Sequence, residues 1–240
     1  YDRAIYHFDA AIQAYKHRDP QHPNVARSLV NLAFVKRLIA LQVQRKIDAD
    51  VATRNLVSGN DMSASARLPQ ERGWLESLRT EAHRELDQAG AIYTHTDNHR
   101  GCGTVHLNRG FLHLDHGDLD LAFTEASQAF LVGEGKFDYI LMARARILQA
   151  IIENTRFEEQ IEDTLDPMSH AQRAHDFAGD AVEFARHTQN RRLLARAQVW
   201  RGLTFANDLL KNVDAARECC DAAMALLKPD VQDYIWDDLQ

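Results

Sequence analysis

Histidine is the residue type through which this sequence could most readily do chemistry, because its 12 histidines are potential metal ligands. His95 and His99 are four residues apart, and His113 and His116 are three apart with Asp115 between them. On a helix, either spacing would place two ligands on one face. Neither pair brings a third or fourth ligand. The sequence therefore predicts histidines that lie near helix ends or face solvent, with no metal site and no cofactor.

Nucleophilic catalysis has equally little support. The three cysteines, Cys102, Cys219 and Cys220, have no histidine partner within a recognisable motif. No Gly-x-Ser-x-Gly and no phosphate-binding glycine loop occurs, and we interpret residues 101–103 as a loop between helices. The small, odd cysteine count fits a reducing compartment, so we expect a cytoplasmic protein. The sequence predicts a protein that is not an enzyme, and an enzyme or metalloprotein is only a remote alternative.

The elements that would position any binding residues are predicted to be helices. The 240 residues include only 11 glycines and 5 prolines, and 45% are hydrophobic. A formal net charge of −7 disfavours nucleic acid as a ligand, because phosphate binding needs a basic face. No run of 18 uncharged apolar residues occurs, so no membrane span is predicted.

A pattern of small residues recurs along the chain. A small residue is followed four positions later by a small or apolar residue, and three positions after that by an alanine. Offsets of four and seven lie on one face of a helix, where small side chains let a neighbouring helix approach closely. The five sets are Ala4, Phe8, Ala11; Ala82, Leu86, Ala89; Ala122, Ala126, Ala129; Ala174, Ala178, Ala181; and Ala216, Cys220, Ala223.

A second helix type precedes most of these sets, and together the two resemble the tetratricopeptide repeat family. Trp200, Leu203 and Thr204 stand before Ala216 and Ala223, while Gly110 and the turn at residues 116–118 stand before Ala122 and Ala129. Asp118 is the expected N-cap of the helix that follows. The resemblance implies helix–turn–helix repeats of about 34 residues that stack into a right-handed α-solenoid.

The spacing departs from that repeat, because successive sets are 40 to 78 residues apart. The longest gap fits either two repeats or one elongated repeat. We prefer an extended hairpin over about 24–95, with a helix at 24–57, a loop at 58–65 and a return helix at 70–94. A smaller hairpin is expected over about 136–187, with its first helix running towards Ile161 and Ser169 as a cap. We expect residues 230–240 to be a capping helix or the start of a continuation of the stack. The expected apolar seam of the long hairpin is Ile47, Val51, Trp74, Leu75 and Leu78.

Residues 1–240 thus read as one all-α solenoid domain, cut from a longer protein. The resemblance implies that the first helix of each repeat lines a concave groove for a peptide or partner protein. Asparagine would bond a peptide backbone, phenylalanine would offer an apolar platform, and arginine would attract carboxylates. The alternative is that the phenylalanines pack between helices and the asparagines cap local backbone groups. The candidates are Arg27, Asn31, Phe34, Asn108, Phe111, Arg144, Arg201 and Phe205.

The function we expect is a protein–protein interaction scaffold that binds a partner, with an acidic peptide suiting the arginines. The alternative is a sensor or regulatory arm of a larger signalling or transcription-regulating protein. The ends of the stack are candidate surfaces for a homodimer, because the first helix lacks its usual cover and we expect Ile5, Phe8 and Ile12 to be exposed.

Overall fold

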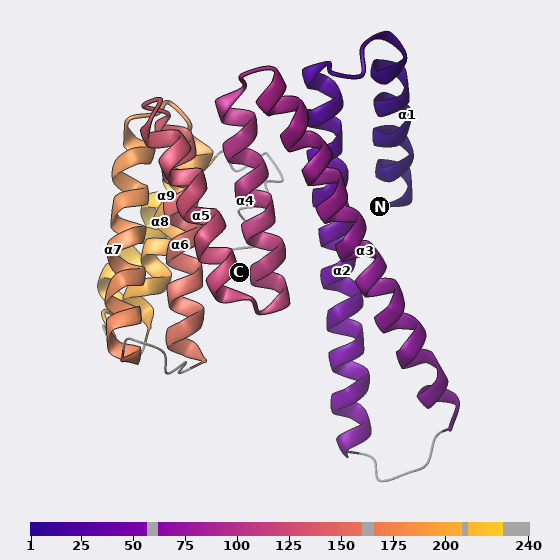
Figure 1. Cartoon of the computed structure of the whole chain (residues 1–240). Coiled ribbons are helices and arrows are strands. Elements are labelled where there is room, and N and C mark those ends of the chain that lie inside the picture. Colours follow the sequence, from indigo (N-terminus) through magenta and orange to yellow (C-terminus); the bar gives the residue numbers. More distant parts are fainter. Residues whose placement is uncertain (57–61, 160–165, 208–210, 228–240) are drawn as a thin grey trace. The chain divides into compact units, whose positions relative to one another are not determined.

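The computed structural model describes residues 1–56, 62–159, 166–207 and 211–227. Every regular element within these ranges is an α-helix, so the all-α prediction is confirmed (Figure 1). The chain forms two compact units, unit 1 (Tyr1–Asp115) and unit 2 (His116–Gln240). The single continuous stack stays a prediction.

Unit 1 contains α1 (Asp2–Arg18), α2 (Pro23–Leu56), α3 (Met62–His95) and α4 (His99–His116). The long helices α2 and α3 run side by side (Figure 1). Helix α2 matches the expected helix to within one residue at each end. Helix α3 begins earlier than expected, so residues 62–65 are helical rather than part of a loop. The rest of the predicted loop lies outside the described residues.

The seam of the α2–α3 hairpin is apolar, with one correction. Ile47, Leu75 and Leu78 are buried and Val51 packs against their cluster, as predicted. Trp74 instead lies 53% exposed on the outer face of α3. Lys36 of α2 is buried and donates hydrogen bonds to Glu81 and Glu85 of α3, so a charged cluster also joins the two helices.

Helix α1 is covered better than the sequence suggested. Ile12 is only 4% exposed and belongs to the main core of unit 1, while Ile5 and Phe8 are half-buried against that core. The expectation that all three would be exposed is therefore wrong. The reason is that α2 packs along α1 and supplies apolar partners such as Val25 and Leu29.

Unit 2 contains α5 (Leu119–Glu134), α6 (Tyr139–Glu158), α7 (Pro167–Arg186), α8 (Arg191–Ala206) and α9 (Val213–Leu226). Its helices pack as sequential neighbours, and α6 also contacts α8. The described part of α6 ends at Glu158; its expected extension towards Ile161 and the expected helix at 230–240 lie outside the described residues.

The stripes of small residues form the contact faces of three helices. The sets on α3, α5 and α7 have no solvent exposure at any of their three positions. The prediction that these positions bring helices together is confirmed there. On α9, Ala223 is fully buried while Ala216 and Cys220 are half-buried.

Gly101 shows why residues 101–103 do not form the loop that we expected. They lie within the first turns of α4. A Cβ atom at Gly101 would come within 2.4 Å of the ring of Tyr93, so the helix and the ring can meet only where the side chain is missing. Here glycine serves a close approach inside a helix rather than a turn.

The helix starts of unit 2 use short polar side chains as N-caps. Asp166, rather than the predicted Ser169, caps α7, and the backbone N–H of Ser169 donates to it at 3.0 Å. Asn190 caps α8 by accepting from the N–H of Leu193 at 3.0 Å. Asp118 is the N-cap residue of α5, as predicted, but its carboxylate makes no capping hydrogen bond and contacts His116 instead.

This difference between caps gives a direct test. We expect Asn190→Ala to lower the free energy of unfolding by about 1 kcal/mol, because an N–H of the first turn loses its acceptor. The matched change Asp118→Ala should cost less than half as much. Urea titration followed by circular dichroism measures both. Equal losses would contradict the assigned capping pattern.

Candidate functional site

The eight candidate binding residues divide between the two units. Five lie in unit 1, on α2 and α4, and three lie in unit 2, on α6 and α8. They are Arg27, Asn31, Phe34, Asn108 and Phe111 in unit 1, and Arg144, Arg201 and Phe205 in unit 2.

The three candidates on α2 form an outward-facing stripe. Their offsets of four and seven residues place them on one side of the helix. Arg27 is exposed, Asn31 is half-buried, and Phe34 is 44% exposed although it is a large apolar residue. Within the described residues, no carboxylate forms an ion pair with Arg27. The stripe therefore offers a cation, an amide and a ring to solvent.

Helix α4 is joined to α2 by Arg37, which the sequence analysis did not single out. Its guanidinium lies 4.6 Å from the centroid of the Phe111 ring, and its Nη2 donates to Asp115 Oδ1 at 2.9 Å. Arg37 is also one helical turn beyond Phe34 on α2. Phe111 is consequently half-buried beneath a paired arginine, whereas Phe34 remains open.

Asn108 binds a local backbone group, which is the alternative interpretation of the asparagines. Its Nδ2 donates to the backbone carbonyl of Thr104 at 2.8 Å, one turn earlier in α4. This bond stabilises the local helix and occupies one of the two amide protons. The carbonyl oxygen of the side chain is the remaining acceptor for a partner.

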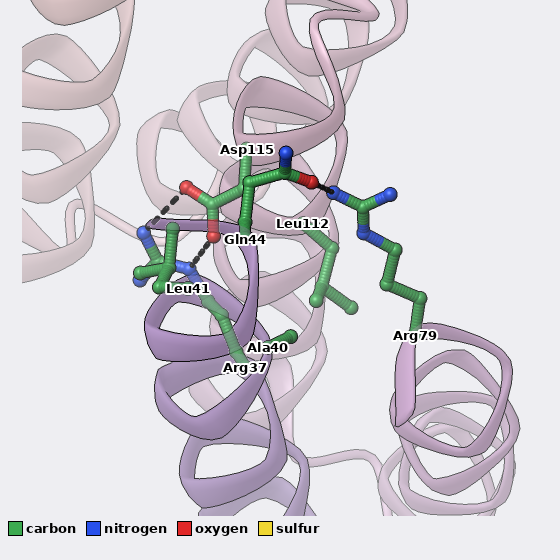
Figure 2. Close-up of a pocket in the computed structure, with 7 residues that line it drawn as sticks. All are labelled: Arg37, Ala40, Leu41, Gln44, Arg79, Leu112 and Asp115. Atoms are coloured by element: carbon green, nitrogen blue, oxygen red, sulfur yellow. Dashed lines mark hydrogen bonds and ion pairs between the residues drawn. The ribbon is translucent and has the colours of Figure 1, made fainter. Parts of the chain in front are cut away.

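A shallow pocket lies beside this junction of α2, α3 and α4 (Figure 2). Its free volume is about 10 Å³, which is room for about one water molecule. Arg79 Nη2 donates to Gln44 Oε1 at 3.4 Å across the pocket. Small-molecule sites need about 300 Å³ or more, so this pocket is too small for such a ligand. The lining residues are Arg37, Ala40, Leu41, Gln44, Arg79, Leu112 and Asp115.

In unit 2 the structure brings two candidates together on α8. The guanidinium of Arg201 lies 5.7 Å from the Phe205 ring centroid. His175 of α7 packs against the same ring at 4.6 Å, and its Nδ1 contacts Thr204 Oγ1 at 3.2 Å. Burial, aided by the nearby Arg201 cation, lowers the pKa of His175. The third candidate, Arg144 on α6, is half-buried.

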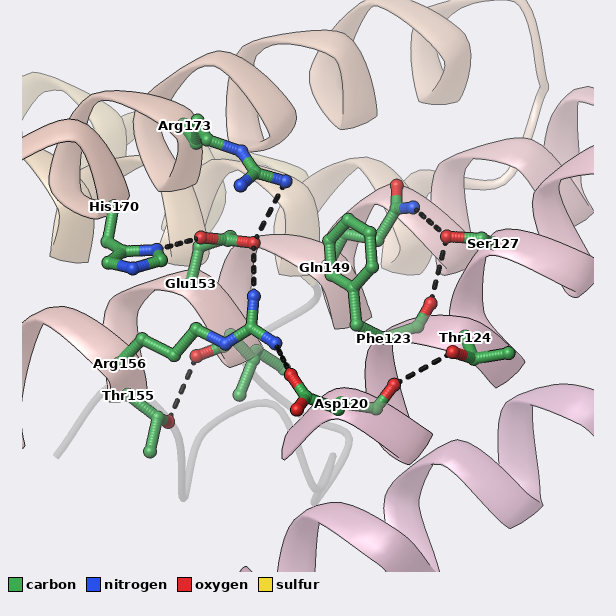
Figure 3. A network of polar contacts seen from close by, with 11 residues as sticks. Asp120, Phe123, Thr124, Ser127, Gln149, Glu153, Thr155, Arg156, His170 and Arg173 are labelled. Atoms are coloured by element: carbon green, nitrogen blue, oxygen red, sulfur yellow. Dashed lines mark hydrogen bonds and ion pairs between the residues drawn. The ribbon is translucent and has the colours of Figure 1, made fainter. Parts of the chain in front are cut away.

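A buried ionic network between α6 and α7 has no counterpart in the sequence predictions (Figure 3). Glu153 and His170 are both fully buried, and Glu153 Oε2 lies 2.6 Å from His170 Nδ1. The other oxygen of Glu153 accepts from Arg156 at 3.1 Å and contacts Arg173 at 3.2 Å. Arg156 also reaches Asp120 of α5. One carboxylate thus connects three basic side chains.

Aromatic rings extend this network between α5 and α7. Phe123 meets Phe177 and Phe130 meets Phe184, each pair with ring centroids 6.0 Å apart. Arg146 of α6 lies 4.0 Å from the Phe130 ring centroid and 4.9 Å from that of Phe177. On each helix the two phenylalanines are seven residues apart, and this spacing could have predicted from the sequence that they share one helix face. The arginines of this network have rings or carboxylates of neighbouring helices as partners. We therefore interpret the network as one that holds these helices together.

In the described parts of the chain, no group of three or more histidine, cysteine or carboxylate side chains could hold a metal ion. None of the helices there is long and apolar enough to cross a bilayer.

The comparisons with known proteins show a fold and no family. No protein-family model matches the chain, and no curated protein matches it. Among solved structures, the crystal structure of BtubC (BKLC) from P. vanneervenii is similar, with a TM-score of 0.51 and 11% sequence identity. The match covers 97% of this chain and 95% of that chain. At this identity, the likeness shows a shared helical fold alone.

Proposed function

We propose that this chain is a protein–protein interaction scaffold, built as a right-handed α-solenoid of tetratricopeptide-like repeats. An acidic segment of a partner protein binds along the concave groove lined by the first helix of each repeat. The observation that carries the proposal is the outward stripe of Arg27, Asn31 and Phe34 on α2.

Two features support this function. The fully buried sets of small and apolar residues on α3, α5 and α7 fit the close stacking of helix pairs. The α2 stripe is exposed, in contrast to these buried sets. Because Arg27 and Phe34 are not buried, packing of the fold does not explain why these residue types stand there. An arginine, an amide and a ring spaced along one helix face suit an extended peptide that carries carboxylates and an apolar side chain.

The test is a selection followed by matched variants. Phage-displayed random 12-residue peptides would be selected on the purified chain, and the enriched peptides measured by isothermal titration calorimetry. We expect enriched peptides with net negative charge. Arg27→Glu and Phe34→Ala should each raise the dissociation constant by about tenfold, which is 1.4 kcal/mol.

The control is Arg72→Glu, which makes the same charge change at an exposed position of α3. It should leave the affinity of the same peptides within twofold, and all three variants should keep the melting temperature of the parent chain. Failure to enrich any peptide would sink the proposal, as would equal losses in Arg27→Glu and Arg72→Glu.

A further inference from the structure

The turn between α5 and α6 carries a phenylalanine that the fold does not explain. Phe137 is 81% exposed, and its backbone φ is +53°, in the left-handed region. Side chains with a Cβ are disfavoured there, and glycine or asparagine is the usual residue. An exposed ring also contributes little to the core. Both backbone preference and burial would favour a different residue at this position.

The same end of unit 2 presents a second aromatic side chain. Tyr139 is 37% exposed and stacks on His187, with ring centroids 4.8 Å apart. His187 follows the last turn of α7. The α5–α6 and α7–α8 turns therefore lie together. The start of α8 lies there too, because Ile140 of α6 and Leu193 of α8 pack in one cluster.

The charges around these rings are mostly basic. Four basic side chains and two carboxylates are exposed at this end: the basic residues are Lys136, Arg186, Arg191 and Arg192, and the acidic ones are Glu134 and Glu183. Asp138 is buried as the N-cap of α6. Arg186 ends α7, where a cation suits the helix dipole. Arg191 and Arg192 open α8, whose first turn contains no acidic residue, although the dipole favours one there.

We propose that this end of unit 2 is a second docking surface, which binds an acidic, apolar segment of a partner protein. The apolar side chain would pack on Phe137 and Tyr139, and a carboxylate would pair with Arg191. A protein segment fits because one short stretch can supply both an apolar side chain for the two rings and a carboxylate for the exposed arginine. This surface is separate from the α2 stripe of unit 1.

The decisive variants are ones that should not harm the fold. Phe137→Asn places a residue that tolerates positive φ in the turn, and Arg191→Glu places the favoured charge in the first turn of α8. Both should therefore match or exceed the melting temperature of the parent chain. If Phe137 had a purely structural role, the Phe137→Asn variant would instead have a lower melting temperature than the parent chain. Arg217→Glu is the matched charge reversal, at an exposed position of α9.

The experiment selects phage-displayed random 16-residue peptides on the parent chain, with counter-selection on the Phe137→Asn, Arg191→Glu double variant. We expect acidic peptides with an apolar residue. Fluorescence anisotropy of these peptides should show dissociation constants at least tenfold higher in each single variant and unchanged within twofold in Arg217→Glu. Arg27→Glu should also leave them unchanged, which separates this proposal from the groove on α2.

Three outcomes would overturn the proposal. The first is that no peptide survives counter-selection. The second is that phosphatidylserine vesicles or a 20-nucleotide single-stranded DNA bind the parent chain, and that the variants at Phe137 and Arg191 weaken this binding as much as they weaken peptide binding. The third is that replacing Asp230, Asp233, Asp237 and Asp238 by asparagine tightens peptide binding tenfold, because the chain's own acidic segment would then be the occupant.

Discussion

Replacing Glu153 by glutamine is expected to lower the free energy of unfolding of unit 2 by about 3–5 kcal/mol, the usual cost of removing one partner from a buried ion pair. Glu153 is fully buried and is the common acceptor for His170, Arg156 and Arg173. A neutral amide would leave Arg156, itself only 7% exposed, paired with the exposed carboxylate of Asp120 but without the buried carboxylate of Glu153. Urea titration followed by circular dichroism measures the loss.

The control for this prediction lies on the same helix. Glu158 is exposed at the end of α6 and accepts one hydrogen bond from Asn154. Glu158→Gln makes the identical chemical change and should cost less than about 0.5 kcal/mol. A double variant that also replaces His170 by leucine should cost less than the sum of the single changes, because the two side chains act as a unit. Equal losses in the two glutamine variants would show that the network contributes nothing specific.

Gly101→Ala is expected to destabilise unit 1 by about 2 kcal/mol, even though alanine is the better helix former. The new methyl group would stand 2.4 Å from the Tyr93 ring, which is itself only 7% exposed and has little room to move. Either the ring or the first turn of α4 must shift. The change in the free energy of unfolding is again measured by urea titration.

The same substitution at Gly73 should have the opposite sign. Gly73 lies within α3, and no atom stands within 4 Å of a Cβ placed there. Gly73→Ala should therefore stabilise the chain by up to about 1 kcal/mol through helix propensity alone. If both alanine variants were more stable than the parent chain, the close contact between α4 and Tyr93 would be refuted.

Much of the fold was predictable because its determinants are local. The offsets of four and seven residues between Ala122, Ala126 and Ala129 predict that the three share one helix face, and all three are fully buried. Trp74 was misplaced because periodicity alone does not separate the two edges of an apolar stripe. The glycines at 101 and 103 were read as turn formers, since the contact with Tyr93 that requires Gly101 is a tertiary property.

The candidate sites divide in the same way. The spacing of the three α2 candidates within one helix could be predicted from the sequence, and the exposure of Arg27 and Phe34 is what the structure adds. Arg37 was not found, because its role depends on Phe111 and Asp115, more than 70 residues away in the sequence. The Glu153–His170 pair links two helices across 17 residues, and neither side chain carries a motif that signals its burial.

Helix packing within each unit joins elements that are neighbours or next neighbours along the chain, such as α1 with α2 and α6 with α8. Contact order is consequently low, and closing the short loops between successive helices costs little entropy. We therefore expect the helix pairs of each unit to form before the contacts that span more of the chain, such as the contact of Arg37 with Asp115.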